Sequence, residues 1–273
     1  MTDTRRGPDA KRAEREFWEE ASCGENYAKG KTLEARLAAH TTARYALEPY
    51  IKDFAKFPEG RGLDVLEIGV GMGADHVEWA KACPRTLSGV DFTHRAIDWT
   101  ADRLASQGLS SRLATADAEN LPFSSASFDL VYSWGVLHHT LDTRRAIAEL
   151  HRVLRPGGTA RIMVYHSRSI VGYLLWLRYA LLVGKPRRSL TDVYATHLES
   201  PDTQAFRIEA MEGMMSSFSR VRVRVQLSFA DLLQGMAGRR HAASLLARQL
   251  WPRAAIRRIM HAHGLLLLVE ATK

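Results

Sequence analysis

The chain has 273 residues, of which 46% are apolar and 25% charged, so it can bury a globular core and is not expected to be disordered. Its formal charge of +8 would suit an anionic partner such as nucleic acid or a membrane surface. No long run of like charges concentrates that charge, so ordinary solvated surface residues explain it better.

The cysteines and the apolar runs of the chain bear on where the protein works. Cys23 and Cys83 are far apart and indicate neither a disulfide framework nor a zinc motif, which favours a reducing, cytoplasmic setting. Residues 1–16 are polar, lack the apolar segment of a secretory signal, and are expected to fray or form a loose helix. The longest apolar run, 170–184, is shorter than the ~20 residues that span a bilayer.

Strand and helix patterns alternate between residues 63 and 165. A helix is expected over 31–56, and further helices are expected to about Ala82, over 93–106 and over 142–154. This alternation predicts an α/β fold with a parallel sheet covered on both faces. The expected strands are Leu63–Ile68, Thr86–Asp91, Arg112–Ala116, Phe128–Trp134 and Thr159–Tyr165.

The remainder of the chain departs from this rhythm. An apolar helix is expected over 169–183, an irregular loop over 185–206 and another helix over 207–217. Two more strands are expected over 220–229 and 264–271. The first of these alternates valine with arginine, which could indicate a nucleic-acid contact. A strand with one face in the core and one in water explains the alternation better.

A glycine-rich loop follows the first expected strand. Gly69, Gly71 and Gly73 permit positive φ and let a ligand approach the backbone closely, beside the N-terminus of a helix. Glu67 lies two positions before the first of these glycines. The loop alone is a weak signal, because dinucleotide-binding proteins use the same physics.

Two further carboxylates stand where the next strands end. Asp91 ends the second strand, which suits a carboxylate that accepts hydrogen bonds from both hydroxyls of a ribose. Asp117 follows the third strand and precedes Ala118, a place where an adenine amino group could be held. Together with the glycine loop, these positions predict a nucleoside-binding edge of the sheet.

The segments that carry these residues resemble class I S-adenosyl-L-methionine-dependent methyltransferases, most closely the group of the ubiquinone/menaquinone-biosynthesis type. The resemblance covers residues 63–165 in order and is weaker in the flanks. After the third glycine, where many relatives have threonine or serine, this chain has Ala74 followed by Asp75. The matching segments are VLEIGVGMG, GVD, ADAENLPF, FDLVYSWGVLHH and RVLRPGG.

This resemblance implies a Rossmann-like, doubly wound, seven-stranded sheet, mostly parallel with an antiparallel C-terminal strand. It divides the chain into a helical cap (1–50), a cofactor-binding core (51–166), a lid insertion (167–217) and C-terminal strands with a helix (218–273). The lid is expected to roof the acceptor pocket, while the segment around Trp18–Tyr27 closes the cofactor side.

The resemblance also implies S-adenosyl-L-methionine as cofactor and S-adenosyl-L-homocysteine as product. The glycines would pass under the methionine moiety, Glu67 would fix its amino group, and Ser133 would face it. Asp91 would bind the ribose, and Phe92 would lie against the adenine. The implied cofactor-binding residues are Glu67, Gly69, Gly71, Gly73, Asp91, Phe92, Asp117, Ala118 and Ser133.

Several side chains at the carboxyl edge of the sheet are candidates for proton transfer. His138 and His139 follow the fourth strand, where a histidine can take a proton from an acceptor or simply brace the loop. Tyr165 and His166 end the fifth strand on the same edge, and His197 lies in the expected lid. We predict His138, Tyr165 and His197 as the catalytic residues.

Methyl transfer from a sulfonium needs few catalytic groups. Displacement at a sulfonium methyl requires an aligned acceptor rather than a nucleophilic serine or cysteine. No metal-ligand spacing is visible, so no metal is expected. We expect transfer to an O, N, C or S atom of a small, partly apolar metabolite. RNA methylation and cofactor binding without methylation stay as alternatives.

The fourth-strand sequence around Ser133 lacks the Asn/Asp-Pro-Pro-Tyr pattern of base-amine methyltransferases, so no specific nucleic-acid partner is expected. The apolar helix 170–183 could meet substrate, a membrane surface or the core. A monomer or a homodimer is expected.

Overall fold

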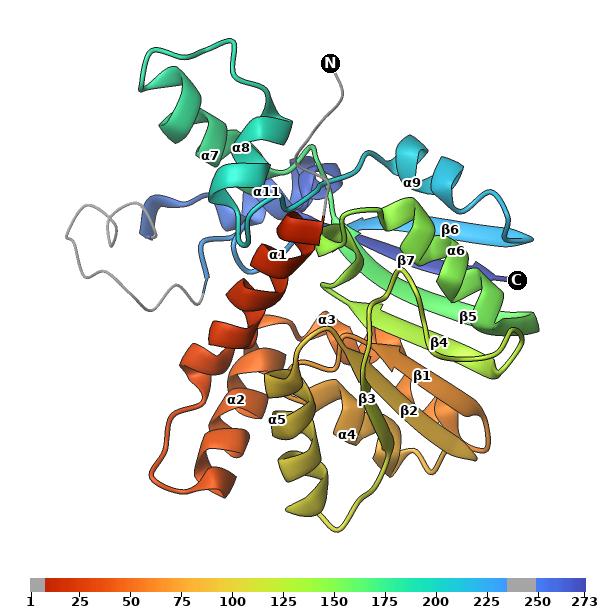
Figure 1. The fold of residues 1–273 in the computed structure, drawn as a ribbon. Helices are drawn as coiled ribbons and strands as arrows, with labels where there is room; N and C mark the ends of the chain where they lie inside the picture. Colours follow the sequence, from red (N-terminus) through yellow and green to blue (C-terminus); the bar gives the residue numbers. More distant parts are fainter. Residues whose placement is uncertain (1–7, 235–248) are drawn as a thin grey trace.

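The computed structural model describes residues 8–234 and 249–273. These fold around a seven-stranded sheet in the order β3-β2-β1-β4-β5-β7-β6, in which β7 runs antiparallel to both of its neighbours (Figure 1). The expected mostly parallel Rossmann-like sheet with an antiparallel C-terminal strand is confirmed. The strands are β1 (Asp64–Ile68), β2 (Thr86–Asp91), β3 (Arg112–Thr115), β4 (Phe128–Trp134), β5 (Leu154–Tyr165), β6 (Arg220–Gln226) and β7 (Leu266–Thr272).

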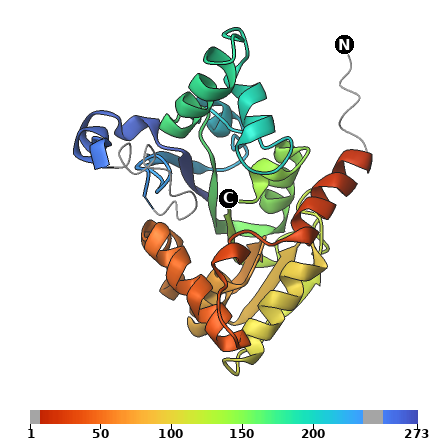
Figure 2. The same cartoon turned by 90° about the vertical axis from the view of Figure 1, so that its left-hand side faces the viewer.

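Helices cover both faces of this sheet (Figures 1 and 2). Their bounds are α1 (Pro8–Glu20), α2 (Leu33–Leu47), α3 (Tyr50–Ala55), α4 (Ala74–Lys81), α5 (His94–Ala105), α6 (Thr143–Val153), α7 (Ile170–Trp176), α8 (Leu190–His197), α9 (Ile208–Met214) and α11 (Arg253–Ile259). Successive residues of a strand point to opposite faces, so Leu66 packs with α6 and α9, whereas Val65 packs with α3 and with Trp79 of α4. Two apolar cores therefore hold the sheet between its helices.

The fifth strand begins earlier than expected. β5 starts at Leu154 rather than Thr159, so the Pro156–Gly158 segment lies within the strand instead of preceding it. The pairing with β4 shifts register between Phe128 and Leu130, which absorbs the extra residues.

The helix expected over 31–56 is two helices, α2 and α3. The break falls at Glu48, whose φ of −125° and ψ of 62° are not helical. Pro49 follows directly, and the residue before a proline is sterically pushed out of the helical region. The chain turns there, so α2 leaves the sheet while α3 packs on it.

A buried arginine links α2 to α5 and to the glycine loop. Arg103 of α5 is 2% exposed, and its guanidinium donates hydrogen bonds to Leu37 O and Thr41 Oγ1 of α2. The same side chain donates to Met72 O in the glycine loop at 2.5 Å. Because one cation satisfies both elements, the position of α2 is linked to that of the loop.

The insertion between β5 and β6 contains more structure than expected. Residues 190–197, within the expected irregular loop, form α8, because Ser189 Oγ caps its N-terminus by accepting from Asp192 N at 3.1 Å. Tyr194 of α8 is buried against α7 and shares a 2.6 Å hydrogen bond with Ser169. In both views α7 and α8 stand together, away from α2 and α5 (Figures 1 and 2).

The apolar run 170–183 is divided into α7 and a π-helical turn, Leu177–Leu181. Its start is buried at Ile170, but Leu182 at its end is 73% exposed. Among the described residues no helix is both long and apolar enough to cross a bilayer.

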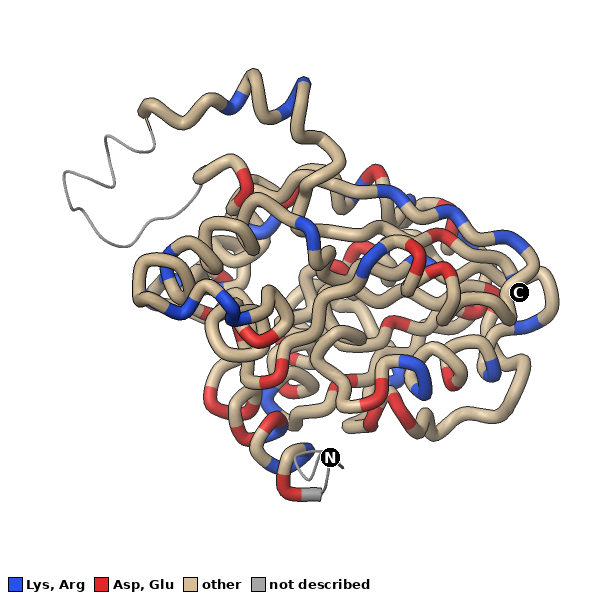
Figure 3. Tube along the Cα trace, turned by 90° about the horizontal axis from the view of Figure 1, so that it is seen from above, with Lys and Arg blue, Asp and Glu red and all other residues tan. Residues whose placement is uncertain are grey.

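The arginines of β6 face water, as expected from their alternation. Arg220, Arg222 and Arg224 are exposed, whereas the intervening Val221 and Val223 are half-buried. Figure 3 shows Lys and Arg interspersed with Asp and Glu along the described chain. The net positive charge is therefore spread over the molecule.

Candidate functional site

A cavity of about 420 Å³ lies at the carboxyl ends of the parallel strands, the usual ligand site of such a sheet. The loop after β1 and the ends of β2, β4 and β5 form one wall, and α1, α2 and the segment between them form the other. The expected cofactor residues that line it are Glu67, Gly69, Gly71, Asp91, Phe92, Asp117 and Ala118.

The three glycines have different tasks. Gly69 has φ +82°, and a Cβ there would overlap Val136. Gly71 has φ +51°, and no described atom lies within 4 Å of the place its Cβ would take, so the backbone is open to a ligand. Gly73 does not line the cavity, and a Cβ on it would meet Thr100 Oγ1 at 2.8 Å. Gly73 thus allows close packing of α5 rather than lining the cavity.

Asp91 is held in one orientation by the backbone around it. Its Oδ2 accepts from Gly71 N at 3.0 Å, and its Oδ1 accepts from the amide and hydroxyl of Thr93 at 3.1 and 2.9 Å. Burial raises the pKa of Asp91, while these hydrogen bonds oppose the rise. The carboxylate is therefore pre-oriented toward the cavity beside the glycine loop.

Helix α1 covers the end of the cavity near Asp117. Lys11 Nζ lies 2.5 Å from Asp117 Oδ2 and 2.6 Å from Glu119 Oε2. The guanidinium of Arg15 stacks on the ring of Phe92 at 4.4 Å. Both contacts place α1 over the residues expected to hold the adenine.

Glu67 is 3% exposed and pairs with His76 of α4, Oε2 to Nδ1 at 2.9 Å. Ser111 Oγ donates to Leu87 O and lies 2.8 Å from His76 Nε2, so it accepts from that nitrogen. Nδ1 of a neutral imidazole is then an acceptor for a protonated Glu67. Burial supports this arrangement, because it lowers the pKa of His76 to about 3 and raises the pKa of Glu67.

Asp75 is the centre of a buried polar network that sequence reasoning missed. It accepts two hydrogen bonds from the Arg44 guanidinium, at 2.9 and 2.5 Å, one from Tyr45 at 3.0 Å and one from Tyr132 at 2.8 Å. Although burial acts to raise it, the charge and hydrogen bonds of Arg44 hold the pKa of Asp75 below its usual value. The network joins α2, α4 and β4 beside the cavity.

Ser133 does not face the cofactor site as expected. It is fully buried and donates from Oγ to Ile68 O at 3.0 Å, which bridges β4 and the end of β1. Side chains of a strand alternate between faces, so its neighbour Trp134 lines the cavity instead.

The other end of the cavity is formed by aromatic and polar side chains from distant segments. Trp134, Met163 and Tyr165 supply apolar surface, and His139 and Glu199 supply polar atoms. Tyr165 donates from its hydroxyl to Glu199 Oε2 at 2.6 Å, and His139 Nε2 lies 3.5 Å from the same oxygen. His139 Nδ1 hydrogen-bonds Ser200 Oγ at 2.8 Å.

The expected catalytic residues are only partly brought together. Tyr165 lines the cavity, but His138 does not; it lies fully buried behind Tyr165, with the ring centroids 3.9 Å apart. Burial lowers the pKa of His138 well below its usual value. His197 is outside the site, stacked on Tyr179 at 3.9 Å and 3.2 Å from Arg188 Nη1. We therefore withdraw His197 as a catalytic candidate.

The sequence of this chain is similar to those of known methyltransferases. A profile described as a methyltransferase domain matches residues 66–162. The chain is 33% identical to methyltransferase GfsG of Streptomyces halstedii over 37% of each chain. It is 34% identical to 27-O-demethylrifamycin SV methyltransferase of Amycolatopsis mediterranei over 37% of this chain and 38% of that one. The match thus spans less than two fifths of these relatives. Residues 66–162 of this chain thus resemble a methyltransferase domain.

A solved S-adenosylmethionine-dependent methyltransferase from Mesorhizobium loti has the same fold as this domain. Its TM-score is 0.56 at 18% identity, over 85% of this chain and 98% of that one. That protein depends on S-adenosylmethionine, which is also the cofactor expected from the sequence of this chain. The cavity fits that molecule, because the open backbone at Gly71 adjoins the pre-oriented carboxylate of Asp91.

The roof of the methyltransferase domain comes from a different segment than expected. From 167–217, which sequence reasoning placed over the acceptor site, only Glu199 lines the cavity in the described part of the chain. Trp18 and Tyr27 line it, and α2 adds Arg44. Trp18 was expected to close the cofactor side, but its ring packs edge-on against His139 at the other end, with the centroids 5.1 Å apart. Burial raises the pKa of neighbouring Glu48 to about 7, against the charge of Arg44.

The residues that were missed share one property: no local motif marks them. Lys11, Arg44 and Glu48 precede the resembling region, and Glu199 follows it. Asp75 lies inside the region, directly after Ala74, which stands where many relatives have threonine or serine; that departure was the one available signal. Charged residues in polar helices are usually solvated, so composition alone does not single these out.

Proposed function

We propose that this chain transfers a methyl group from S-adenosyl-L-methionine to a small, partly apolar metabolite by in-line displacement. One observation carries the proposal: a single cavity joins the nucleoside-binding end, at Asp91 and Asp117, to an apolar and polar end at Trp134, Tyr165 and Glu199. A cofactor and an acceptor held in one cavity can react without leaving it.

The cofactor supplies an activated methyl group on its sulfonium sulfur. Within the cavity Asp91 would accept hydrogen bonds from the ribose hydroxyls, and the Gly71 backbone would lie against the methionine part. Asp117 and the Ala118 amide would bind the adenine, whose face would contact Phe92. Glu67 would bind the cofactor's amino group, which requires its carboxyl to give up the proton that it shares with His76.

The end of the cavity at Trp134, Tyr165 and Glu199, here called the acceptor end, would position the acceptor. Trp134, Met163 and Phe229 present apolar surface to an acceptor, while Tyr165 and Glu199 offer a polar contact. Helices α1 and α2 form one wall of this space. An acceptor must be held at about 3–3.5 Å from the methyl group for displacement, and a walled cavity favours that alignment.

Two features favour a small acceptor over a nucleic acid. The cavity is bounded by α1 and α2, and the basic residues are interspersed with acidic ones (Figure 3). One of the similar proteins is by name a rifamycin methyltransferase, which methylates a small molecule. We extend that class of acceptor to this chain.

A labelled-methyl transfer assay tests the proposal. The full chain is incubated with S-adenosylmethionine labelled in its methyl group and, separately, with a metabolite extract, bulk tRNA or duplex DNA. We expect label in extractable small molecules and none in either polymer at physiological salt. The Asp91→Ala variant is the control and should lose the signal. Stoichiometric labelling of tRNA or DNA, or cofactor binding with no labelled product, would contradict the proposal.

A further inference from the structure

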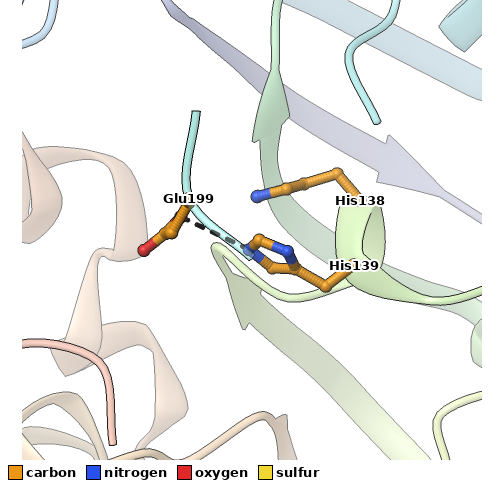
Figure 4. Close-up of side chains that lie close together, drawn as sticks. All are labelled: His138, His139 and Glu199. Atoms are coloured by element: carbon orange, nitrogen blue, oxygen red, sulfur yellow. Dashed lines mark ion pairs between the residues drawn. The ribbon is translucent and has the colours of Figure 1, made fainter. Parts of the chain in front are cut away.

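Three side chains at the acceptor end converge on one point. His138 and His139, both in the 3-10 turn Leu137–His139 after β4, face Glu199 from the segment after α8 (Figure 4). One ligand atom from each of the three lies within 4.8 Å of the others. Two of the three residues are buried, and Glu199 reaches them from the rim of the cavity.

Hydrogen bonding does not account for this cluster. His138 is 0% exposed, and neither of its ring nitrogens has a hydrogen-bond partner among the described residues. His139 Nε2 also lacks one within the described chain, and its 3.5 Å separation from Glu199 exceeds the ~2.7–2.9 Å of a charge-assisted bond. Buried polar atoms that protein leaves unsatisfied call for another explanation, of which a bound ion is one.

We propose that His138, His139 and Glu199 bind a divalent cation of the zinc class at the acceptor end of the cavity. Two imidazoles and one carboxylate are a ligand set of catalytic zinc sites, which keep a fourth position open. Zinc ligand atoms lie ~2.0–2.2 Å from the metal, so the three groups must close in by about 1 Å. Glu199 follows the end of α8 and is the exposed member of the three.

The surroundings match those of metal ligands. Ligating histidines usually bond their second nitrogen to a polar partner, and His139 Nδ1 does so with Ser200 Oγ at 2.8 Å. Ligating carboxylates are in turn hydrogen-bonded, and Tyr165 donates to Glu199 at 2.6 Å. His139 and Glu199 line the cavity, so the open position would face the acceptor.

The site narrows the acceptor class, in a step that rests on the proposed function. A zinc-class cation lowers the pKa of a bound oxygen or sulfur, so it suits an acceptor with a hydroxyl or thiol group. The acceptor loses its proton to solvent on binding the cation. The new oxygen–carbon or sulfur–carbon bond then forms as the cofactor's sulfur–methyl bond breaks, and that electron pair stays on the cofactor's sulfur.

Metal titration without cofactor or acceptor tests the site by itself. The chelator-treated full chain is titrated with Zn²⁺ by calorimetry and with Co²⁺ by visible absorption. We expect one ion per chain and the absorption bands of nitrogen- and oxygen-ligated Co²⁺. Glu199→Gln and His139→Gln should each weaken binding by at least about 10–100-fold. His197→Gln, outside the site, is the matched control and should bind as the wild type does.

The outcomes separate this proposal from the proposed function. Absence of saturable binding, or equal losses in His197→Gln and Glu199→Gln, overturns the site. Equal labelled-methyl transfer by the metal-free and Zn²⁺-loaded chain overturns its part in the reaction. Normal metal binding in a chain that transfers no methyl group supports the site while contradicting the methyltransferase activity. Glu199 is on the rim, so its variant tests the site even where replacement of buried His138 unfolds the chain.

Discussion

The two ends of the cavity are built in opposite ways. At the cofactor end, one continuous stretch, 67–118, supplies the glycine loop and the carboxylates, and backbone amides orient Asp91. At the acceptor end, Trp134, Tyr165 and Glu199 come from segments far apart in the chain. The residues at the cofactor end are held by local backbone geometry, which leaves a motif in the sequence, whereas those at the acceptor end meet only through tertiary packing.

The largest expected effect is on the Asp75 network, which joins α2, α4 and β4 beside the cavity. Asp75→Ala removes the buried carboxylate that accepts from Arg44, Tyr45 and Tyr132, and leaves Arg44 only its 3.8 Å contact with Glu48. Loss of one partner of a buried pair costs about 3–5 kcal/mol. We expect the free energy of unfolding in urea to fall by that amount. Asp98→Ala, an exposed change on α5, is the control and should stay within about 0.5 kcal/mol. Equal stability of the two variants would show that the Asp75 network does not stabilise the fold.

A smaller effect is confined to the cofactor end. Asp91→Ala removes an acceptor of two charged hydrogen bonds, so S-adenosylhomocysteine should bind about 2–4 kcal/mol more weakly, roughly 30- to 1,000-fold. Calorimetry on Glu199→Gln should give an affinity within about three-fold of the wild type. Similar losses in both variants would mean that the cavity binds its ligands as one unit and that the division made above is wrong.

The cavity should also carry a pH dependence, through Glu48 in its wall. Burial raises the pKa of Glu48 from 4.5 to about 7, so the folded chain holds a proton that the unfolded chain has lost. That stabilisation is fully present below pH 4.5 and is lost as pH rises through about 7. Relative to Glu48→Gln, the wild type should lose on the order of 2 kcal/mol of unfolding free energy between pH 5 and 8. Parallel urea transitions at both pH values would contradict this.

The smallest effect concerns helix α1 over the adenine. Lys11 is part-exposed and occupies Asp117, which the adenine amino group would need. An exposed ion pair contributes at most about 1 kcal/mol, so Lys11→Met should tighten S-adenosylhomocysteine binding by up to about five-fold. Arg12→Ala, on the exposed face of the same helix, serves as the control. Weaker binding in Lys11→Met would assign the lysine to the site rather than to its closure.

The sequence predicted what depends on local patterns. Buried apolar runs predicted the parallel strands of the sheet and the place of Asp91 at the end of one of them. Glycine spacing predicted the positive φ at Gly69 and Gly71. The helix α8 was missed because its few buried residues, Val193 and Tyr194, lie in a polar segment. Glu199 meets His139 only through tertiary folding, and no spacing along the chain encodes that meeting.

The position of β7 has a consequence for the chain during its synthesis. β7 lies between β5 and β6, although it follows both in the sequence. While residues 227–265 are being made, β6 has no neighbour to pair with, and the outer edge of β5 is open. Unpaired strand edges invite association between nascent chains, and charged side chains on a strand oppose it. Arg220, Arg222 and Arg224 can therefore act as gatekeepers against aggregation before the last strand arrives.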